Sequence, residues 1–266
     1  MSGSGGSERD VKRTVRALPD TAAVQRAAAE EFVARTEAAA RTRGVAFVAL
    51  SGGSTPRGLH TLLADPAAPF RAKVPWERLH VFWGDERCVP PDHPDSNYRM
   101  AHDTLLARVP IPPDHVHRMA GEDPDPARAA ERYGRELREV SESHGRLDAG
   151  WPRFDVVILG MGADGHTASL FPGTDAVHET ARPVVAVWVA KLGTHRITLT
   201  PPVLNRADAV LFLVTGPDKA ETLAAVLEGP SQPDVFPSQI VQPTAGTLVW
   251  LIDAAAGARL GARSGR

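Results

Sequence analysis

The fold is decided by the stretch Phe154-Asp155-Val156-Val157-Ile158-Leu159-Gly160-Met161-Gly162-Ala163-Asp164-Gly165-His166-Thr167. Its apolar run, Val156 to Leu159, predicts a strand that is buried on both faces, as in a parallel sheet. The run ends in a glycine-rich loop that carries one carboxylate and one imidazole, Asp164 and His166. Open α/β sheets bind ligands at the carboxyl ends of their strands. We therefore expect Asp164 and His166 at the mouth of a cleft.

The three glycines of this loop, Gly160, Gly162 and Gly165, also match the dinucleotide pattern G-x-G-x-x-G. That pattern normally opens the first βα unit of a domain, and an acidic residue ends the second strand. Here the loop lies past the middle of the chain, and the next strand-like run ends in Lys191. Glu179 has roughly the expected spacing of ~20 residues but precedes that run. The pattern therefore does not predict a nucleotide site.

Composition limits the class of protein. A chain of 266 residues allows one large α/β domain or two small ones. The net charge of −2 gives no reason to expect a nucleic-acid partner, and the apolar runs are too short to span a membrane. Met1 to Ser7 is rich in Gly and Ser and indicates a flexible tail rather than a signal peptide. The single cysteine, Cys88, excludes an internal disulfide framework, which fits a cytoplasmic location.

A second polar loop follows the predicted strand Val45 to Leu50. It reads Ser51-Gly52-Gly53-Ser54-Thr55-Pro56, and a helix is predicted from about Arg57 to Ala64. A loop of small residues before a helix N-terminus is suited to an anion, because free amides and the helix dipole point toward it. Gly52, Gly53 and Ser54 are therefore candidate phosphate contacts, and a plain tight turn is the alternative. No Gly-Lys-Ser/Thr follows, so a nucleoside triphosphate is not expected.

A third polar loop, Asp85-Glu86-Arg87, follows the predicted strand Leu79 to Trp83. Taken alone, it reads as a solvated charge cluster, but Arg87 is also suited to bind a phosphate with two hydrogen bonds. We expect the neighbouring Cys88 to be a packing residue, since no histidine lies close in sequence to activate it. A helix carrying Asn97 is predicted from about Ser96 to Arg108.

Three further polar features have more than one explanation. Lys219 follows the strand Ala209 to Val214 and lies near a helix N-terminus, where a cation is disfavoured. This position suggests a ligand, although solvent exposure would also explain it. Alternation places Arg196 on the polar face of a strand 196–200. His115 and His117 share one face of a short strand and lack further metal ligands at suitable spacing, so two surface histidines are expected.

About seven predicted strands alternate with helices, which indicates a doubly wound, mostly parallel Rossmann-like sheet with helices on both faces. The runs 184–190 and 196–200 have no helix between them and predict a small antiparallel appendage. We expect a tail at residues 1–9 and a single domain at 10–266. The remaining predicted elements are a strand at 11–18, a helix capped by Asp20 and ending near Arg43, a helix at 123–144, a helical turn at 167–173, a strand at 247–252 and a helix at 254–260.

Several segments together resemble the 6-phosphogluconolactonases, which belong to a larger family with the glucosamine-6-phosphate deaminases. The resemblance rests on segments spread in order over nearly the whole chain: Ser51 to Pro56, Phe82 to Pro90, Ser96 to Tyr98, Gly160 to Pro172, Arg196 to Thr200 and Gly216 to Ala220. The chain departs from many relatives before Arg196, where it reads Ala190-Lys-Leu-Gly-Thr-His195 instead of a Lys-Pro-rich turn. That departure leaves the role of Lys191 open.

The resemblance implies hydrolysis of 6-phosphoglucono-δ-lactone to 6-phosphogluconate in the pentose phosphate pathway, with no metal and no cofactor. It implies that His166 is the general base and that Arg87, Lys219 and Arg196 contact the phosphate; Asp85 and Asn97 fall in its motifs. Asp164 would orient His166 or bind a sugar hydroxyl. The expected partner is a small sugar-phosphate lactone, and the protein is expected to be a monomer or small homo-oligomer. The chemistry is consistent: an unperturbed histidine pKa of ~6.5 leaves a neutral fraction to activate water.

Two alternatives differ in class. A glucosamine-6-phosphate deaminase shares the glycine-rich loops, but such enzymes typically read Asp-Glu-Tyr where this chain has Asp85-Glu86-Arg87. They also carry an acid soon after the histidine motif, where this chain has Ser169 to Pro172. A sugar-phosphate sensor on this scaffold usually has a DNA-binding segment, and none is predicted before Asp10. Turnover of the lactone distinguishes an enzyme from a sensor.

Overall fold

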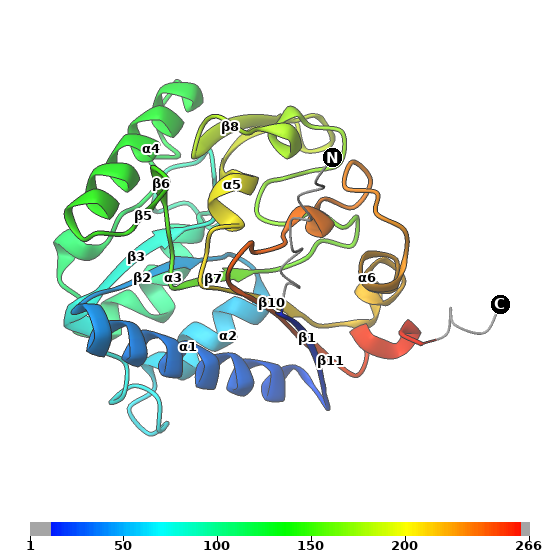
Figure 1. Cartoon of the computed structure of the whole chain (residues 1–266), viewed down its shortest axis with the longest axis horizontal. Coiled ribbons are helices and arrows are strands. Elements are labelled where there is room, and N and C mark those ends of the chain that lie inside the picture. The colour runs from blue at the N-terminus through cyan, green and yellow to red at the C-terminus, as the bar shows by residue number, and fades with distance from the viewer. Residues whose placement is uncertain (1–11, 262–266) are drawn as a thin grey trace, which may run out of the picture.

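A six-stranded parallel sheet forms the centre of the computed structural model, which describes residues 12–261. The predicted tail 1–9, the boundary at residue 10 and Val11 lie outside this range. The strand order is β1-β11-β10-β7-β2-β3 (Figure 1). The strands are β1 (Lys12–Leu18), β2 (Ala46–Leu50), β3 (Leu79–Trp83), β7 (Val156–Leu159), β10 (Ala209–Val214) and β11 (Thr247–Asp253).

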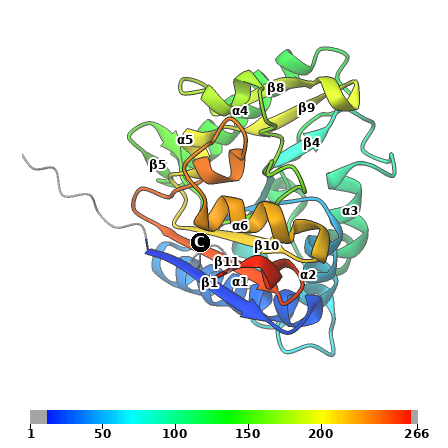
Figure 2. The same ribbon diagram turned by 90° about the vertical axis from the view of Figure 1, so that its right-hand side faces the viewer.

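Helices cover both faces of this sheet, which confirms the predicted doubly wound architecture. One face carries α1 (Thr21–Arg43) and α2 (Ser54–Ala64), and the other carries α4 (Pro126–Ser143), α5 (Pro201–Leu204) and α6 (Ala220–Glu228), as Figures 1 and 2 show. Helix α1 begins as predicted, because Asp20 accepts a 2.8 Å hydrogen bond from the amide of Ala23. It ends at Gly44, whose φ of 80° is a left-handed conformation that favours glycine.

The predicted antiparallel appendage is confirmed and has a third strand. Its order is β4 (Asp85–Arg87), β9 (Thr194–Leu199) and β8 (Val184–Val189). Figure 2 shows it on the same side of the parallel sheet as α6. A separate two-stranded ribbon joins β5 (Leu147–Asp148) and β6 (Trp151–Pro152). The polar segment Asp85 to Arg87 is therefore itself a strand, and its side chains alternate between two faces.

Several predicted boundaries and short elements differ from the structure. Helix α3 (Asn97–Thr104) stops before Leu105, and a separate 3₁₀ helix covers Leu106–Arg108. The predicted C-terminal helix is a single 3₁₀ turn, Ala256–Arg259. Residues 167–173 contain no helical turn; Thr167 and Leu170 instead form a β-bridge around Ala168, whose φ is 47°. These segments are too short for propensity to decide between turn types.

The expectation of two surface histidines at 115 and 117 is wrong. His117 is 6% exposed, and its Nε2 lies 3.0 Å from Nδ1 of His80. Its Nδ1 lies 2.8 Å from Oε1 of Glu136 on α4. His115 stacks on His80 with ring centroids 4.0 Å apart, and it ends a 3₁₀ turn rather than lying in a strand. The helix α4 covers this side of β3, which a local sequence pattern does not reveal.

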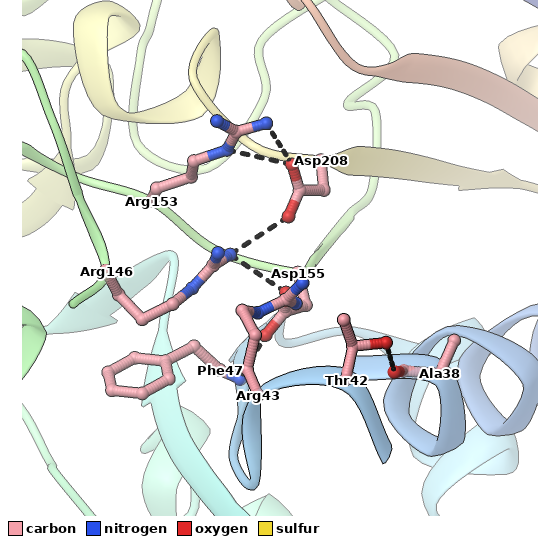
Figure 3. Close-up of polar contacts among 8 residues, drawn as sticks. All are labelled: Ala38, Thr42, Arg43, Phe47, Arg146, Arg153, Asp155 and Asp208. Carbon is pink, nitrogen blue, oxygen red and sulfur yellow. Dashed lines mark hydrogen bonds and ion pairs between the residues drawn. The ribbon is translucent and has the colours of Figure 1, made fainter. Parts of the chain in front are cut away.

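A buried ion network connects the amino ends of three neighbouring strands (Figure 3). Asp155 precedes β7; its Oδ2 accepts a 2.8 Å hydrogen bond from the amide of Phe47 in β2. Arg146 Nη2 lies 2.8 Å from Oδ1 of Asp155 and 3.0 Å from Oδ2 of Asp208, which precedes β10. Arg43 also pairs with Asp155 and Arg153 with Asp208. The network thus connects β2, β7 and β10 at their amino ends, opposite the carboxyl ends that carry the polar loops.

Candidate active site

The strand order reverses between β2 and β7, because the chain continues from β2 to β3 on one side and from β7 to β10 on the other. Such a switch point is where open α/β sheets bind ligands. A pocket of about 410 Å³ opens there. It is lined by all the predicted site residues except Asp164, namely Gly52, Gly53, Ser54, Asp85, Arg87, Asn97, His166, Arg196 and Lys219.

The loop after β2 forms one wall of the pocket. Helix α2 begins at Ser54, three residues earlier than predicted, so its free first amides lie at the pocket. Gly53 precedes it with a φ of 105°, which requires glycine. A β-carbon at Gly52 would clash with the side chain of Asn97. The side chain of Thr55 contacts Thr215 through a 2.8 Å hydroxyl–hydroxyl hydrogen bond, which joins this loop to the one after β10.

Two arginines lie side by side on the adjacent strands β4 and β9. Arg87 pairs with Arg196 in the strand register, and directly opposite residues share one face of a sheet. Like charges in such a pair repel, and burial together with Arg87 lowers the pKa of Arg196. Arg87 donates from Nη1 to the carbonyl of Asp95. The Nε atoms of both arginines are buried and have no hydrogen-bond partner among the described residues. Two unpaired donors with excess positive charge favour an anionic ligand.

The neighbouring carboxylates are not the solvated cluster that the sequence suggested. Asp85 is 7% and Glu86 3% exposed. Glu86 points away from the arginine face and accepts hydrogen bonds from the amides of Asn97 and Tyr98, both 2.8 Å, and from Ser96 Oγ at 3.1 Å. Burial raises the pKa of Glu86, and these hydrogen bonds oppose the shift. Glu86 therefore fixes the start of α3, whose Asn97 donates to the carbonyl of Asp85 at 2.8 Å.

The loop after β7 holds His166 against Asp164. Gly162 donates to the carbonyl of His166 at 2.9 Å, and Gly165 reverses the chain with a φ of 78°. Asp164 Oδ1 accepts from the amide of His166 at 3.2 Å and contacts its Nδ1. The imidazole stacks on Phe171 with centroids 4.1 Å apart. Asp164 lies behind the imidazole, in the wall of a neighbouring cavity, and so Nε2 is the nitrogen left for a ligand.

The electrostatic surroundings keep His166 neutral. Burial lowers its pKa from 6.5 to about 4. The charge of Asp85 raises it, and the charges of Lys219, Arg196 and Arg87 lower it further. At neutral pH the imidazole is therefore almost entirely a base, more so than an unperturbed histidine.

Lys219 lies in a 3₁₀ turn, Pro217–Lys219, directly before α6. Its Nζ is 2.9 Å from Oδ2 of the exposed Asp218, which offsets its unfavourable position near a helix N-terminus. The pocket side chains thus come from strand ends that are far apart in sequence. Cys88, by contrast, is half-buried against the core, and burial raises its thiol pKa to about 11, as expected of a packing residue.

Four contacts that shape the pocket escaped sequence reasoning. Ser169 donates from Oγ to Asp85 Oδ2 at 2.7 Å, and its amide donates to Thr198 Oγ1 at 3.2 Å. The Thr55–Thr215 contact and the Phe171 ring under His166 were also missed. The alternation of strand 196–200 placed Thr198 on the face of Arg196, and this was the only local signal for any of these contacts.

Comparison with known proteins gives one family. The family model of glucosamine-6-phosphate isomerases/6-phosphogluconolactonase matches residues 19–250. A 6-phosphogluconolactonase of Nostoc sp. is 43% identical over 94% of this chain and 99% of its own, and one of Synechocystis sp. is 43% identical over 82% and 86%. The solved 6-phosphogluconolactonase of Trypanosoma brucei superposes with a TM-score of 0.79 at 30% identity, over 95% of this chain and 100% of its own. The chain belongs to the family of glucosamine-6-phosphate isomerases and 6-phosphogluconolactonases.

Proposed function

We propose that this protein hydrolyses 6-phospho-D-glucono-1,5-lactone to 6-phospho-D-gluconate, the second step of the oxidative pentose phosphate pathway. The observation that carries the proposal is the position of a neutral, Asp164-bound His166 in the same pocket as two arginines whose buried Nε donors have no partner within residues 12–261. A base for water and a receptor for phosphate are the two elements that this substrate requires. The relatives that match nearly the whole chain carry the same activity in their names.

The phosphate is held, in this proposal, by Arg87, Arg196 and Lys219 together with the first amides of α2. Charge-assisted hydrogen bonds of this kind are about twice as strong as neutral ones. The phosphate lies remote from the reacting carbonyl, so its binding energy positions the lactone ring. Asp85 and Asn97 line the same pocket, and in this proposal they contact sugar hydroxyls.

His166 activates water in the proposed mechanism. The Nε2 atom takes a proton while the water oxygen bonds to the lactone carbonyl carbon. The intermediate then collapses: the bond from that carbon to the ring oxygen breaks, and the proton passes from His166 to the leaving oxygen. Asp164 holds Nδ1 as the donor, so that Nε2 stays free to accept. Asp164 is thus a positioning residue for His166.

We propose that the reaction needs neither metal nor cofactor. Within residues 12–261, no group of three or more His, Cys, Asp or Glu side chains is placed to hold a metal ion. A lactone is an activated ester, for which a base and an oriented water suffice. Activity that is lost on chelation with EDTA and regained with zinc contradicts this part of the proposal.

None of the helices within residues 12–261 has the length and apolar character that a membrane span requires.

The test is turnover of the lactone, coupled to an NADP-dependent 6-phosphogluconate dehydrogenase, with spontaneous hydrolysis subtracted. We expect His166→Gln to lose ~10²–10⁴-fold in kcat while it still binds 6-phosphogluconate and unfolds at the temperature of the parent. His102→Gln, on the exposed side of α3, is the matched control and should retain full activity. A folded His166→Gln protein with most of its kcat rules out His166 as the base.

The same preparations should be assayed with glucosamine 6-phosphate. Release of ammonia from that substrate, without turnover of the lactone, assigns the pocket to the deaminase branch of the family instead. Binding of both sugar phosphates without turnover of either assigns it to a sensor.

A further inference from the structure

The carboxylate of Asp164 is shared between two groups. Its Oδ1 contacts Nδ1 of His166, and its Oδ2 contacts the ammonium of Lys191. Lys191 lies in the 3₁₀ turn Ala190–Leu192 between β8 and β9, so it reaches the histidine loop from a different sheet. The chain of contacts therefore runs from Lys191 through Asp164 to the proposed base.

The same lysine packs against the ring that supports the imidazole. Lys191 Nζ lies 4.7 Å from the ring centroid of Phe171, on which His166 stacks. Phe171 and Lys191 line both the 410 Å³ pocket and a neighbouring cavity of about 940 Å³, and Asp164 lines the second cavity. The Lys191–Asp164 pair thus stands at the wall between the two spaces, immediately behind the base.

We propose that Lys191 is a positioning residue for His166, one that fixes the Asp164 carboxylate and offsets part of its negative charge. This inference rests on the proposed function. An uncompensated carboxylate beside an imidazole orients it but also favours the imidazolium form, which cannot accept a proton. A lysine on the far oxygen allows Asp164 to hold the ring while less of its charge acts on the ring. The hydrogen bond to Asp164 then sets the orientation of His166, and the charge of Lys191 adjusts its base strength.

No other cation contacts Asp164 among the described residues. The remaining charged groups that face His166 come from three elements and line the pocket instead: Asp85 and Arg87 of β4, Arg196 of β9 and Lys219 before α6. The three cations lie on the ligand side, where a bound phosphate would neutralise much of their charge. Lys191 also lines this pocket, but its ammonium is paired with Asp164 behind the imidazole.

The experiment compares the parent with Lys191→Met, Lys191→Arg and Lys73→Met. Methionine keeps an apolar stem against Phe171 and removes the charge, and arginine restores the charge. Lys73 is an exposed lysine in the loop after α2 and serves as the matched control. Each protein is ¹³C-labelled at histidine, and the His166 resonance, identified by its absence in His166→Gln, is titrated by NMR. The pH profile of kcat/KM for the lactone is measured in parallel.

We expect the His166 titration midpoint in Lys191→Met to rise by about half a unit to one unit, as for the loss of a screened charge several ångströms away. The acid limb of kcat/KM should move with it. At pH 7 kcat should fall about three- to tenfold, with KM within about twofold, and arginine should restore the parent values.

A midpoint that stays unchanged in Lys191→Met overturns the inference. So does a rise in KM with an unmoved acid limb, because Lys191 would then contact the substrate itself. The two proposals fail separately: a parent that does not hydrolyse the lactone contradicts the proposed function, and the NMR titration still upholds or overturns the role of Lys191.

Discussion

Ser169 Oγ donates a 2.7 Å hydrogen bond to Oδ2 of Asp85, and this bond connects the histidine loop to the strand that carries Arg87. Both partners are buried, with Asp85 7% and Ser169 0% exposed. The bond holds the Asp85 carboxylate beside His166, where its effect on the pKa of His166 opposes that of the neighbouring cations. Asp85 therefore has an electrostatic effect on His166 that can be measured independently of its proposed contact with substrate.

We expect the acid limb of kcat/KM in the parent to have its midpoint at about pH 4, because burial lowers the pKa of His166 to about 4. The Asp85 carboxylate raises that pKa, so Asp85→Asn should move the limb to lower pH, by about half a unit to one unit. The measurement is a series of initial rates corrected for spontaneous hydrolysis. Asp114→Asn, at an exposed acid, should leave the limb in place; a limb that moves to higher pH in Asp85→Asn contradicts the assignment.

The paired arginines predict a loss that depends on the phosphate. Replacing Arg87 or Arg196 by Met should raise KM for the phosphorylated lactone about ten- to hundredfold, since a hydrogen bond to a charged group contributes about 1.5–3 kcal/mol. With unphosphorylated glucono-1,5-lactone, the same variants should match the parent within about threefold. Arg118→Met, which removes an exposed ion pair with Glu122, is the control. Equal losses on both lactones place the arginines elsewhere than at the phosphate.

We expect the buried side chain of His60 to lower the free energy of unfolding. It is fully buried in α2, and neither ring nitrogen has a hydrogen-bond partner among the described residues. His60→Leu should therefore raise the free energy of unfolding at pH 7 by about 1–2 kcal/mol. Urea unfolding followed by circular dichroism measures this difference, and His102→Leu is the exposed control.

The pH dependence of this variant follows from the same burial, which lowers the pKa of His60 from 6.5 to about 4. Between these values the unfolded chain binds more protons at this site, so the parent loses stability as pH falls through that window. The advantage of His60→Leu should grow by about 2 kcal/mol between pH 7 and pH 5. An advantage that is constant with pH contradicts the buried, neutral state of His60.

Asp155 is expected to be essential for stability and dispensable for chemistry. It is 3% exposed and holds Arg146 and the amide of Phe47 (Figure 3). Asp155→Asn removes one of the two carboxylates that pair with the buried Arg146 guanidinium and should cost about 3–5 kcal/mol. Under conditions where the variant is folded, its kcat should equal that of the parent. Thr42→Ala removes an exposed hydrogen bond to the carbonyl of Ala38 in the same region and should change stability by less than about 0.5 kcal/mol.

The sequence predicted the elements with strong local signals. The buried strand 156–159, the capped helix after Asp20 and the antiparallel appendage all lie where they were expected. The polar loops could be placed together because parallel strands share one carboxyl edge. The register that sets Arg87 opposite Arg196 joins residues more than a hundred positions apart, and no local pattern encodes it.

The misses have the same physical origin. His117 is buried because α4 packs over it, and Glu86 is buried because α3 begins on it. Both are tertiary effects on residue types that are seldom fully buried. The helical turn predicted at 167–173 is absent, because Ala168 adopts a positive φ that alanine rarely takes.

The arginine–aspartate network at the amino ends of the strands has a consequence for how this chain can tolerate changes at its site. The network fixes the alignment of β2, β7 and β10 at their amino ends. The carboxyl ends of the same strands lead into the loops of Ser51, Gly160 and Thr215. Substitutions in the loops therefore change the reacting groups without shifting the strands that carry them. When the strands are held in place at the end opposite the site, a few side-chain changes in the loops can alter the reaction on a sugar phosphate. This is consistent with a family that unites isomerases and lactonases.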